Sequence, residues 1–482
     1  MSNNILAFFF LLFQFTLNMM VFPFKPAFTK RNGDITMDNP EYNGTHYAID
    51  YFKNQLYTEI KIGNPYQKLK ILLSAETCAF KIGKSSNCIY SNEYLSYYNR
   101  NLSSDFNYTS LYSGSIHEFN GEKGSTAEDT IYAYTDINLK NEKAFKKVGF
   151  YLGSDTNDKL CGIIGLEQDN IICQRIYNIV KDCKSKKYIN NRKFMLKYGN
   201  TINEGMFIIG SEFKDVIENY NESQTFNMKM TNRVRVYRFG FEMSKAKIGE
   251  RNETDTNIMA EINNDLSFII VGPQYLTDFN NSFFKEYIEK KICIINIYDN
   301  VPSLILSEKY SVIECNKEKF GENDLKNFPK FYFYISNYYE EKKLFFDYTD
   351  LFTETKYKYF FNIIFDNSMR TKIDLGKIFL KKYPINFDFD NNILEIYDNF
   401  VEKPNKKEGG NDPEDPNNPN ENKTVIYILI IILLVSVTGV VGYFLGKYLN
   451  KIRKKRANEL LDDYDYQTDN QLVNDRDNQT ES

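Results

Sequence analysis

The chain has 482 residues, 42% hydrophobic and 16% aromatic, so it is long enough to bury two sizeable cores and to carry additional segments. Its 60 lysines and arginines stand against 64 aspartates and glutamates, which gives a formal net charge of -4. This balance lacks the broad basic surface that nucleic-acid binding needs, so no nucleic-acid partner is expected.

The N-terminus has the pattern of a secretory signal. Residues 5–17 are mostly apolar, which is the length of a signal-peptide core and too short to span a bilayer comfortably. We therefore expect a signal peptide over residues 1–20. Residues 21–50 include Lys30 and Arg31 and fit an N-terminal arm and a cleaved pro-segment equally well.

Residues 51–401 alternate short apolar, aromatic and β-branched runs with turn signals. Examples of such runs are residues 56–62 (LYTEIKI) and residues 393–397 (ILEIY). Many short strands at this spacing predict a mostly β body. Helical periodicity is clear only in a few stretches, such as residues 173–188 and 275–290.

The C-terminal region predicts a membrane anchor. Residues 402–423 are rich in Asn, Pro, Gly and charge, which is typical of a disordered stalk. Residues 424–446 are almost wholly apolar and, at about 1.5 Å per helical residue, cover the hydrocarbon core of a bilayer. Basic residues follow directly, so the tail, residues 447–482, is expected in the cytoplasm. We expect a single-pass type I protein of the secretory pathway or the cell-surface membrane.

Glycosylation sequons and cysteines agree with a body exported to an oxidising lumen. On the predicted lumenal side, sequons begin at Asn43, Asn101, Asn107, Asn221, Asn252, Asn280 and Asn422. All seven cysteines precede the predicted membrane segment: Cys78, Cys88, Cys161, Cys173, Cys183, Cys293 and Cys315. An odd count leaves at least one thiol free or bonded to another chain.

Short motifs follow one another in a distinctive order along the body. Residues 60–73 (IKIGNPYQKLKILL) give a strand, a turn and a second strand that leads into Ser74. Residues 260–268 (AEINNDLSF) repeat the strand-to-loop plan in the second half. The other motifs are residues 124–131 (GSTAEDTI), 161–166 (CGIIGL), 205–210 (GMFIIG) and 373–383 (IDLGKIFLKKY). Their shared order over about 350 residues resembles the pepsin-like (A1) family of aspartic proteases.

The resemblance implies a mostly β, bilobed pepsin-like acid protease fold, with two β-barrel-like lobes around a cleft. The N-terminal lobe is expected at residues 51–225 and the C-terminal lobe at residues 226–401. In this register Ser74 and Asn263 stand at the two catalytic aspartate positions. His117 stands at the flap position that the family usually fills with tyrosine.

Two further expectations follow from the same resemblance. Cys293 and Cys315 fall where the family commonly places a disulfide in its second lobe. The glycine positions of the two catalytic loops carry Glu76 and Asp265, which are the candidates for a displaced carboxylate pair.

The replacements at Ser74 and Asn263 predict a loss of the protease reaction. In the resembled family two carboxylates share one proton, so that one is the base toward water and the other the acid toward the substrate carbonyl. A serine hydroxyl is not ionised near neutral pH without a neighbouring base, and an asparagine amide has no acid-base role. We therefore expect both positions to be non-functional in catalysis.

Three functions stay open on the sequence alone. The leading hypothesis is a membrane-anchored pseudoprotease whose cleft binds a peptide or protein without cutting it. The alternative is an active aspartic-type endopeptidase that uses the displaced carboxylates. The third is a structural surface glycoprotein. With only His46 and His117, no histidine-based zinc site is supported, so neither metal nor cofactor is expected, and the oligomeric state stays open.

Overall fold

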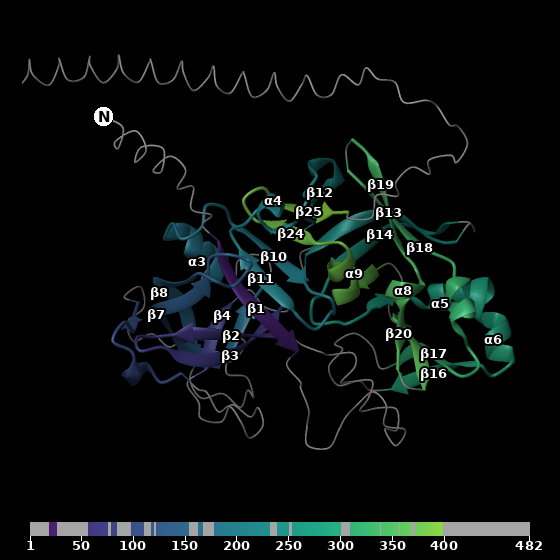
Figure 1. The fold of residues 1–482 in the computed structure, drawn as a ribbon, viewed down its shortest axis with the longest axis horizontal. Coiled ribbons are helices and arrows are strands. Elements are labelled where there is room, and N and C mark those ends of the chain that lie inside the picture. Colours follow the sequence, from purple (N-terminus) through teal and green to yellow (C-terminus); the bar gives the residue numbers. More distant parts are fainter. Residues whose placement is uncertain are drawn as a thin grey trace, which may run out of the picture. The chain divides into compact units, whose positions relative to one another are not determined.

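The computed structural model describes most of the first of two compact units, Met1–Val401, and none of the second, Glu402–Ser482. The described residues are 19–26, 56–75, 79–83, 98–109, 117–119, 122–153, 162–166, 178–231, 239–249, 253–299, 309–337, 339–355, 357–367 and 372–398. Within them, two sheets account for most of the regular structure (Figure 1).

The first sheet has 14 strands among the described residues. Its order is β12 (Thr225–Lys229), β25 (Ile393–Tyr397), β24 (Ile385–Asp388), β10 (Lys193–Tyr198), β11 (Gly205–Ile209), β1 (Met20–Pro26), β2 (Leu56–Ile62), β3 (Gln67–Ser74), β9 (Gly162–Gly165), β4 (Phe80–Gly83), β8 (Glu142–Gly153), β7 (Glu122–Tyr134) and β5 (Asn107–Tyr108), while β6 (His117–Phe119) pairs with β7.

The second sheet has 11 strands in the part of the chain that the structure describes. Its order is β19 (Glu341–Phe346), β18 (Phe331–Ser336), β13 (Gly240–Ile248), β14 (Glu253–Ile262), β23 (Lys372–Leu375), β15 (Ile269–Val271), β22 (Ile363–Asp366), β17 (Lys309–Asn316), β21 (Lys358–Phe361) and β20 (Phe352–Glu354), while β16 (Cys293–Asp299) pairs with β17. The prediction of a mostly β body is confirmed.

Alternating burial explains why the short runs form strands. In β2, every second side chain from Leu56 to Ile62 is buried and those between are partly or fully exposed. In β3 the alternation gives way to continuous burial from Ile71 to Ser74. That end of β3 pairs with β2 along one edge and with β9 along the other, and the unbroken burial places the side chains of both its faces in the core where the first loop begins.

Strand β1 shows that the start of the predicted arm or pro-segment is part of the core. It lies between β11 and β2, with Met20 opposite Ile209 and Phe24 opposite Thr58. Its side chains from Met20 to Phe22 are almost fully buried. Removal of these residues would expose the neighbouring strand edges, so they are an integral strand of the first sheet.

The end of the chain's described part returns to the first sheet. Residues 226–401 are predicted to form the second lobe, yet β24 pairs with β10, and β25 pairs with β24 and β12. The rings of Phe387 and Phe194 stack at 4.4 Å between centroids, and Phe239 lies 4.5 Å from Phe387. This aromatic packing ties both halves of the chain into one hydrophobic core.

Short helices connect the strands. They are α3 (Ile179–Ser185), α4 (Phe213–Val216), α5 (Pro273–Phe279), α6 (Lys285–Glu289), α7 (Glu322–Lys326), α8 (Tyr348–Leu351) and α9 (Lys377–Lys382), with single turns η1 (Arg100–Leu102) and η4 (Glu222–Gln224) and a π-helical segment η5 (Asn280–Phe284). The helix predicted over residues 275–290 is formed by α5, η5 and α6 in succession. Of the one predicted over 173–188, α3 is described and residues 173–177 lie outside the described ranges.

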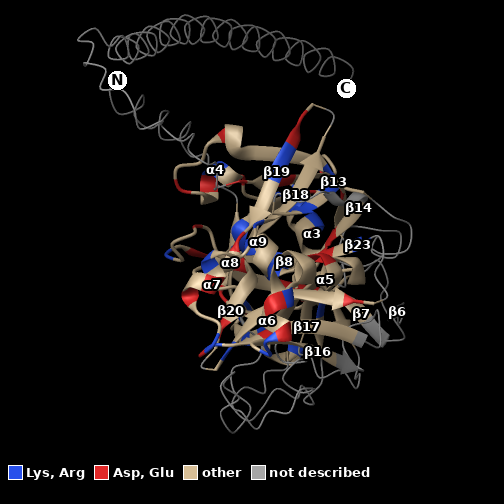
Figure 2. Ribbon diagram, turned by 90° about the vertical axis from the view of Figure 1, so that its right-hand side faces the viewer, with Lys and Arg blue, Asp and Glu red and all other residues tan. Residues whose placement is uncertain are grey.

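Several predicted segments lie outside the described residues: 1–18 of the signal peptide, the stalk 402–423, the transmembrane segment 424–446 and the tail 447–482. In the part of the chain that is described, no helix is both long and apolar enough to cross a membrane. Elements such as β19 and α6 carry acidic as well as basic residues, in keeping with the nearly balanced charge of the chain (Figure 2).

Candidate functional site

The first loop begins where β3 ends. Ser74 is the last residue of β3 and is buried, and its carbonyl oxygen accepts a hydrogen bond from the Leu166 amide at 2.8 Å. Strand β9 runs parallel to β3 there, with Gly165 opposite Ser74. The structure therefore holds Ser74 rigidly at a strand end. The residue predicted as the first displaced acid, Glu76, lies outside the described residues.

The second loop begins where β14 ends. The Asn263 amide donates to the Leu375 carbonyl of β23 at 3.0 Å, which continues the parallel pairing of the two strands. The Asn263 side-chain oxygen accepts from the Asp265 amide at 3.0 Å. Asn263 therefore acts as a turn residue whose side chain shapes its own loop.

The two loops meet through side chains. The Ser74 hydroxyl donates to Asp265 Oδ2 at 2.9 Å, and Asn264 Nδ2 donates to the Leu73 carbonyl oxygen at 3.1 Å. We call these four residues the loop junction. Ser74, Asn264 and Asp265 are all at most 5% exposed. One carboxylate, from Asp265, thus reaches the serine at the first predicted aspartate position, across 191 residues of sequence.

Lys377 is a charged residue beside this junction that the sequence motifs did not single out. It follows Gly376, where a Cβ would lie 2.1 Å from the Phe268 carbonyl oxygen, so only glycine fits. The Lys377 amide donates to the Leu266 carbonyl oxygen at 2.8 Å, which holds the start of α9 against the second loop. The signal that could have revealed it is a lysine inside the otherwise apolar run of residues 375–380.

The Lys377 side chain is fully buried, and its amine has no hydrogen-bond partner among the described residues. Burial lowers the pKa of this amine to about 7, and the nearby Asp265 carboxylate offsets part of that effect. The hydroxyl of Tyr198 on β10 is also enclosed, although its ring is partly exposed. Burial, together with repulsion from Asp265, raises the pKa of Tyr198.

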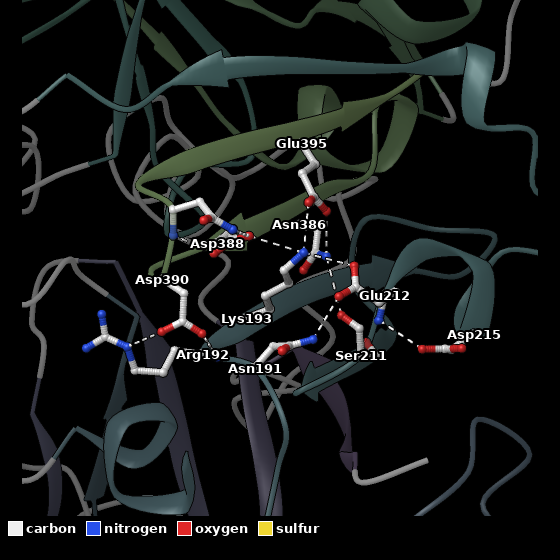
Figure 3. A network of polar contacts seen from close by, with 11 residues as sticks. Asn191, Arg192, Lys193, Ser211, Glu212, Asp215, Asn386, Asp388, Asp390 and Glu395 are labelled. Carbon is white, nitrogen blue, oxygen red and sulfur yellow. Dashed lines mark hydrogen bonds and ion pairs between the residues drawn. The ribbon is translucent and has the colours of Figure 1, made fainter. Parts of the chain in front are cut away.

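A second buried lysine lies where β10 meets β24 and β25 (Figure 3). Lys193 Nζ contacts Glu395 Oε1 at 2.8 Å, Glu212 Oε2 at 2.9 Å and Asp388 Oδ2 at 3.1 Å. We call these four residues the Lys193 centre. Burial disfavours the ammonium, but hydrogen bonds to Glu395 and Glu212 outweigh it and raise the pKa of Lys193 above its usual range.

Two other predicted site features have clear places in the fold. Strand β6 begins at His117 and forms a hairpin with β7, with His117 opposite Gly124, and the His117 side chain lies outside the described part. The predicted disulfide between Cys293 and Cys315 is confirmed and joins the paired strands β16 and β17. Cys183 is a buried free thiol, and the other four cysteines lie outside the described residues.

A pocket of about 550 Å³ opens on β12, β13 and the end of β18. Met228, Glu242, Ser244 and Asn337 are among the residues that line it, and none of its lining residues belongs to either loop. The pocket therefore lies apart from the loop junction. Among the described residues, no group of three or more His, Cys, Asp or Glu side chains could hold a metal ion.

Comparisons with known proteins agree with this architecture. Residues 55–397 match the family described as eukaryotic aspartyl protease. Among solved structures, basic 7S globulin from soybean is similar, with a TM-score of 0.51 and 11% sequence identity over 79% of this chain and 96% of that chain. At that identity the likeness concerns the fold alone. No curated protein matches the sequence significantly.

Proposed function

The chain belongs to the eukaryotic aspartyl protease family, and we propose that it is a pseudoprotease, a member that keeps the family's fold but does not catalyse peptide-bond hydrolysis. One observation carries the proposal. In the register of the family's motifs, Ser74 at the end of β3 and Asn263 directly after β14 take the two positions expected for the aspartates.

The reaction requires two carboxylates that share a proton, one as base and one as acid. Asp265 supplies a single carboxylate, and one of its oxygens already accepts the Ser74 hydroxyl. The Asn263 side chain is engaged by the Asp265 amide. An alcohol and an amide cannot replace the missing acid, because neither exchanges a proton readily near neutral pH.

A second candidate function is an active endopeptidase with displaced acids. The contact between Asp265 and Ser74 favours it, since it brings one acid to the first predicted aspartate position. This function requires a second acid within proton-sharing distance, for which Glu76 is the candidate. We rank it below the pseudoprotease, because a titratable side chain beside Asp265 is Lys377, a base, whereas the family's reaction uses two acids.

We also propose that the body is anchored by residues 424–446 as a type I protein and binds an extended peptide or protein segment without cutting it. A cleft of this family binds peptide through backbone hydrogen bonds, which do not depend on the catalytic acids. The composition of residues 402–446 supports the anchor. A structural glycoprotein without a ligand is the remaining alternative.

The test of the proposed inactivity is a proteolysis assay on the full-length protein. Wild type, D265N and E76Q are incubated with a broad peptide mixture from about pH 3 to about pH 7, with and without pepstatin. We expect no cleavage by any of them. Pepstatin-sensitive cleavage that D265N or E76Q abolishes would establish the displaced-acid enzyme. A variant that restores the aspartate and the glycine of both loops, S74D/N263D with E76G/D265G, measures whether the scaffold can still support the reaction.

The test of the proposed binding uses fluorescently labelled casein fragments as extended peptide probes. We expect saturable binding to the wild-type protein that unlabelled fragments displace. Absence of binding at the highest soluble protein concentration would favour the structural glycoprotein. Protease protection of one epitope placed within residues 402–423 and one placed within the tail, residues 447–482, in sealed vesicles tests the proposed orientation.

A further inference from the structure

Lys377 carries an inference that does not depend on whether the protein is an enzyme. Its amine is fully buried, has no hydrogen-bond partner among the described residues, and lies beside the carboxylate that joins the two loops. We propose that Lys377 makes the loop junction sensitive to pH: when its amine takes up a proton, the hydrogen bond between Ser74 and Asp265 is lost.

The physical reason is the cost of a buried ammonium. A neutral amine without a hydrogen-bond partner costs a few kcal/mol at most in the interior, whereas an isolated ammonium costs far more. The protonated form therefore favours any rearrangement that gives Nζ an acceptor. Among the described residues, the charged acceptor whose field acts on this amine is Asp265, and that field favours the protonated form.

Two rearrangements would satisfy the ammonium, and both disrupt the loop junction. Asp265 can turn from Ser74 toward Lys377, which exchanges a neutral donor for a charged one and makes the stronger hydrogen bond. Alternatively, water can enter between the loops and hydrate the ammonium. In each case the proton comes from solvent, and the Ser74 hydroxyl loses its bond to Asp265 across the two halves of the chain.

The surroundings of Lys377 leave Asp265 as the charged group that acts on it. Helix α9 packs against β10 and β23, and the titratable groups on these elements and on the adjoining β14 have other engagements. On β10, Lys193 binds three carboxylates, Lys197 donates to the Val216 carbonyl oxygen, and Tyr198 is a neutral phenol. On β23, Lys372 pairs with Glu261 of β14 and with Asp374. On α9 itself, Lys382 pairs with Asp350.

Hydrogen exchange of the full-length protein tests the proposal. Exchange is followed by mass spectrometry at about pH 8 and about pH 6, after correction for the intrinsic pH dependence of exchange. For wild type we expect peptides that cover the end of β3 and residues 263–266 to exchange several-fold faster at the lower pH. K377M should show the same corrected rates at both values. K381M, an exposed lysine of the same helix, is the matched control and should behave as wild type.

Equal corrected rates in wild type at the two pH values would overturn the proposal, and so would a pH dependence that K377M retains. A second measurement needs no variant: an NMR titration of the protein with labelled lysine side chains. We expect one lysine to titrate at about 7, and the absence of any lysine that titrates well below the ordinary value of about 10.4 would overturn the proposal. Neither readout involves proteolysis or peptide binding, so its failure is separable from that of the proposed function.

Discussion

Two buried lysines lie between the halves of this chain, and their environments differ. Lys193 is surrounded by three carboxylates from β24, β25 and the start of α4, whereas Lys377 has Asp265 as its one charged neighbour among the described residues. The pKa of Lys193 is raised and that of Lys377 is lowered to about 7. Burial disfavours the charged amine at both sites. The number of acids that accept hydrogen bonds from it, and their distance, therefore decide whether the lysine stays protonated.

The two lysines therefore differ in what they contribute to the fold. The Lys193 centre is a permanently charged connection between β10 and the returning strands β24 and β25. The Lys377 site changes its charge within the physiological range, next to the loops that carry the predicted aspartate positions. Substitutions at and around the two lysines test this difference.

The first prediction removes the permanent cation. K193M leaves Glu212, Asp388 and Glu395 close together without a counter-charge, and we expect the free energy of unfolding to fall by about 3–5 kcal/mol at neutral pH. Urea denaturation measures it. The control is K197M on the same strand, whose amine donates to the Val216 carbonyl oxygen, and we expect a change within about 1 kcal/mol. Equal effects of the two variants would contradict the difference between the centres.

The second prediction removes the titrating amine. Because the folded-state pKa of Lys377 lies below its unfolded value of 10.5, the unfolded chain binds more protons between about pH 7 and 10.5, so wild-type stability should rise with pH there. K377M should abolish this rise and should stabilise the protein by on the order of 1–4 kcal/mol below about pH 7. Denaturation midpoints across this range measure both effects, with K381M as control. A destabilised K377M would place Lys377 in the same class as Lys193.

The third prediction concerns the contact between the loops. S74A removes the hydroxyl that donates to Asp265, and we expect a loss of about 1.5–3 kcal/mol, typical of a hydrogen bond to a charged group. A double-mutant cycle with D265N isolates the pairwise energy. We expect clear coupling at about pH 8 and less at about pH 6, where Lys377 competes for Asp265. Additive effects at both pH values would show that the contact contributes no pairwise energy.

The fourth prediction concerns an ion pair near the Lys193 centre whose two side chains are more exposed than that of Lys193. Arg192 Nε donates to Asp390 at 2.9 Å, and both side chains are partly exposed. Burial raises the pKa of Asp390, but hydrogen bonds from Arg192 outweigh it, so the pKa is lowered. The stabilisation is present at neutral pH and lost as the pH falls through that lowered value. R192M should cost about 0.2–1 kcal/mol in denaturation experiments, and a loss as large as that of K193M would show that burial is not what separates them.

The sequence by itself was sufficient for the features that local patterns encode. The short apolar, aromatic and β-branched run of residues 56–62 predicted a strand, and the structure forms one there with every second side chain buried. The motif order predicted the family, which the match over residues 55–397 establishes, and the resemblance placed the disulfide between Cys293 and Cys315 correctly.

Only the tertiary structure revealed the contact of Asp265 with Ser74, the position of β1 inside the first sheet and the isolation of Lys377. A local sequence pattern indicates whether a segment forms a helix, a strand or a loop. It does not report which side chain 191 residues away will meet a given hydroxyl. The charge of a buried lysine depends on the solvent and acids that the completed fold leaves around it, and that is why Lys193 and Lys377 read alike in the sequence and differ in the protein.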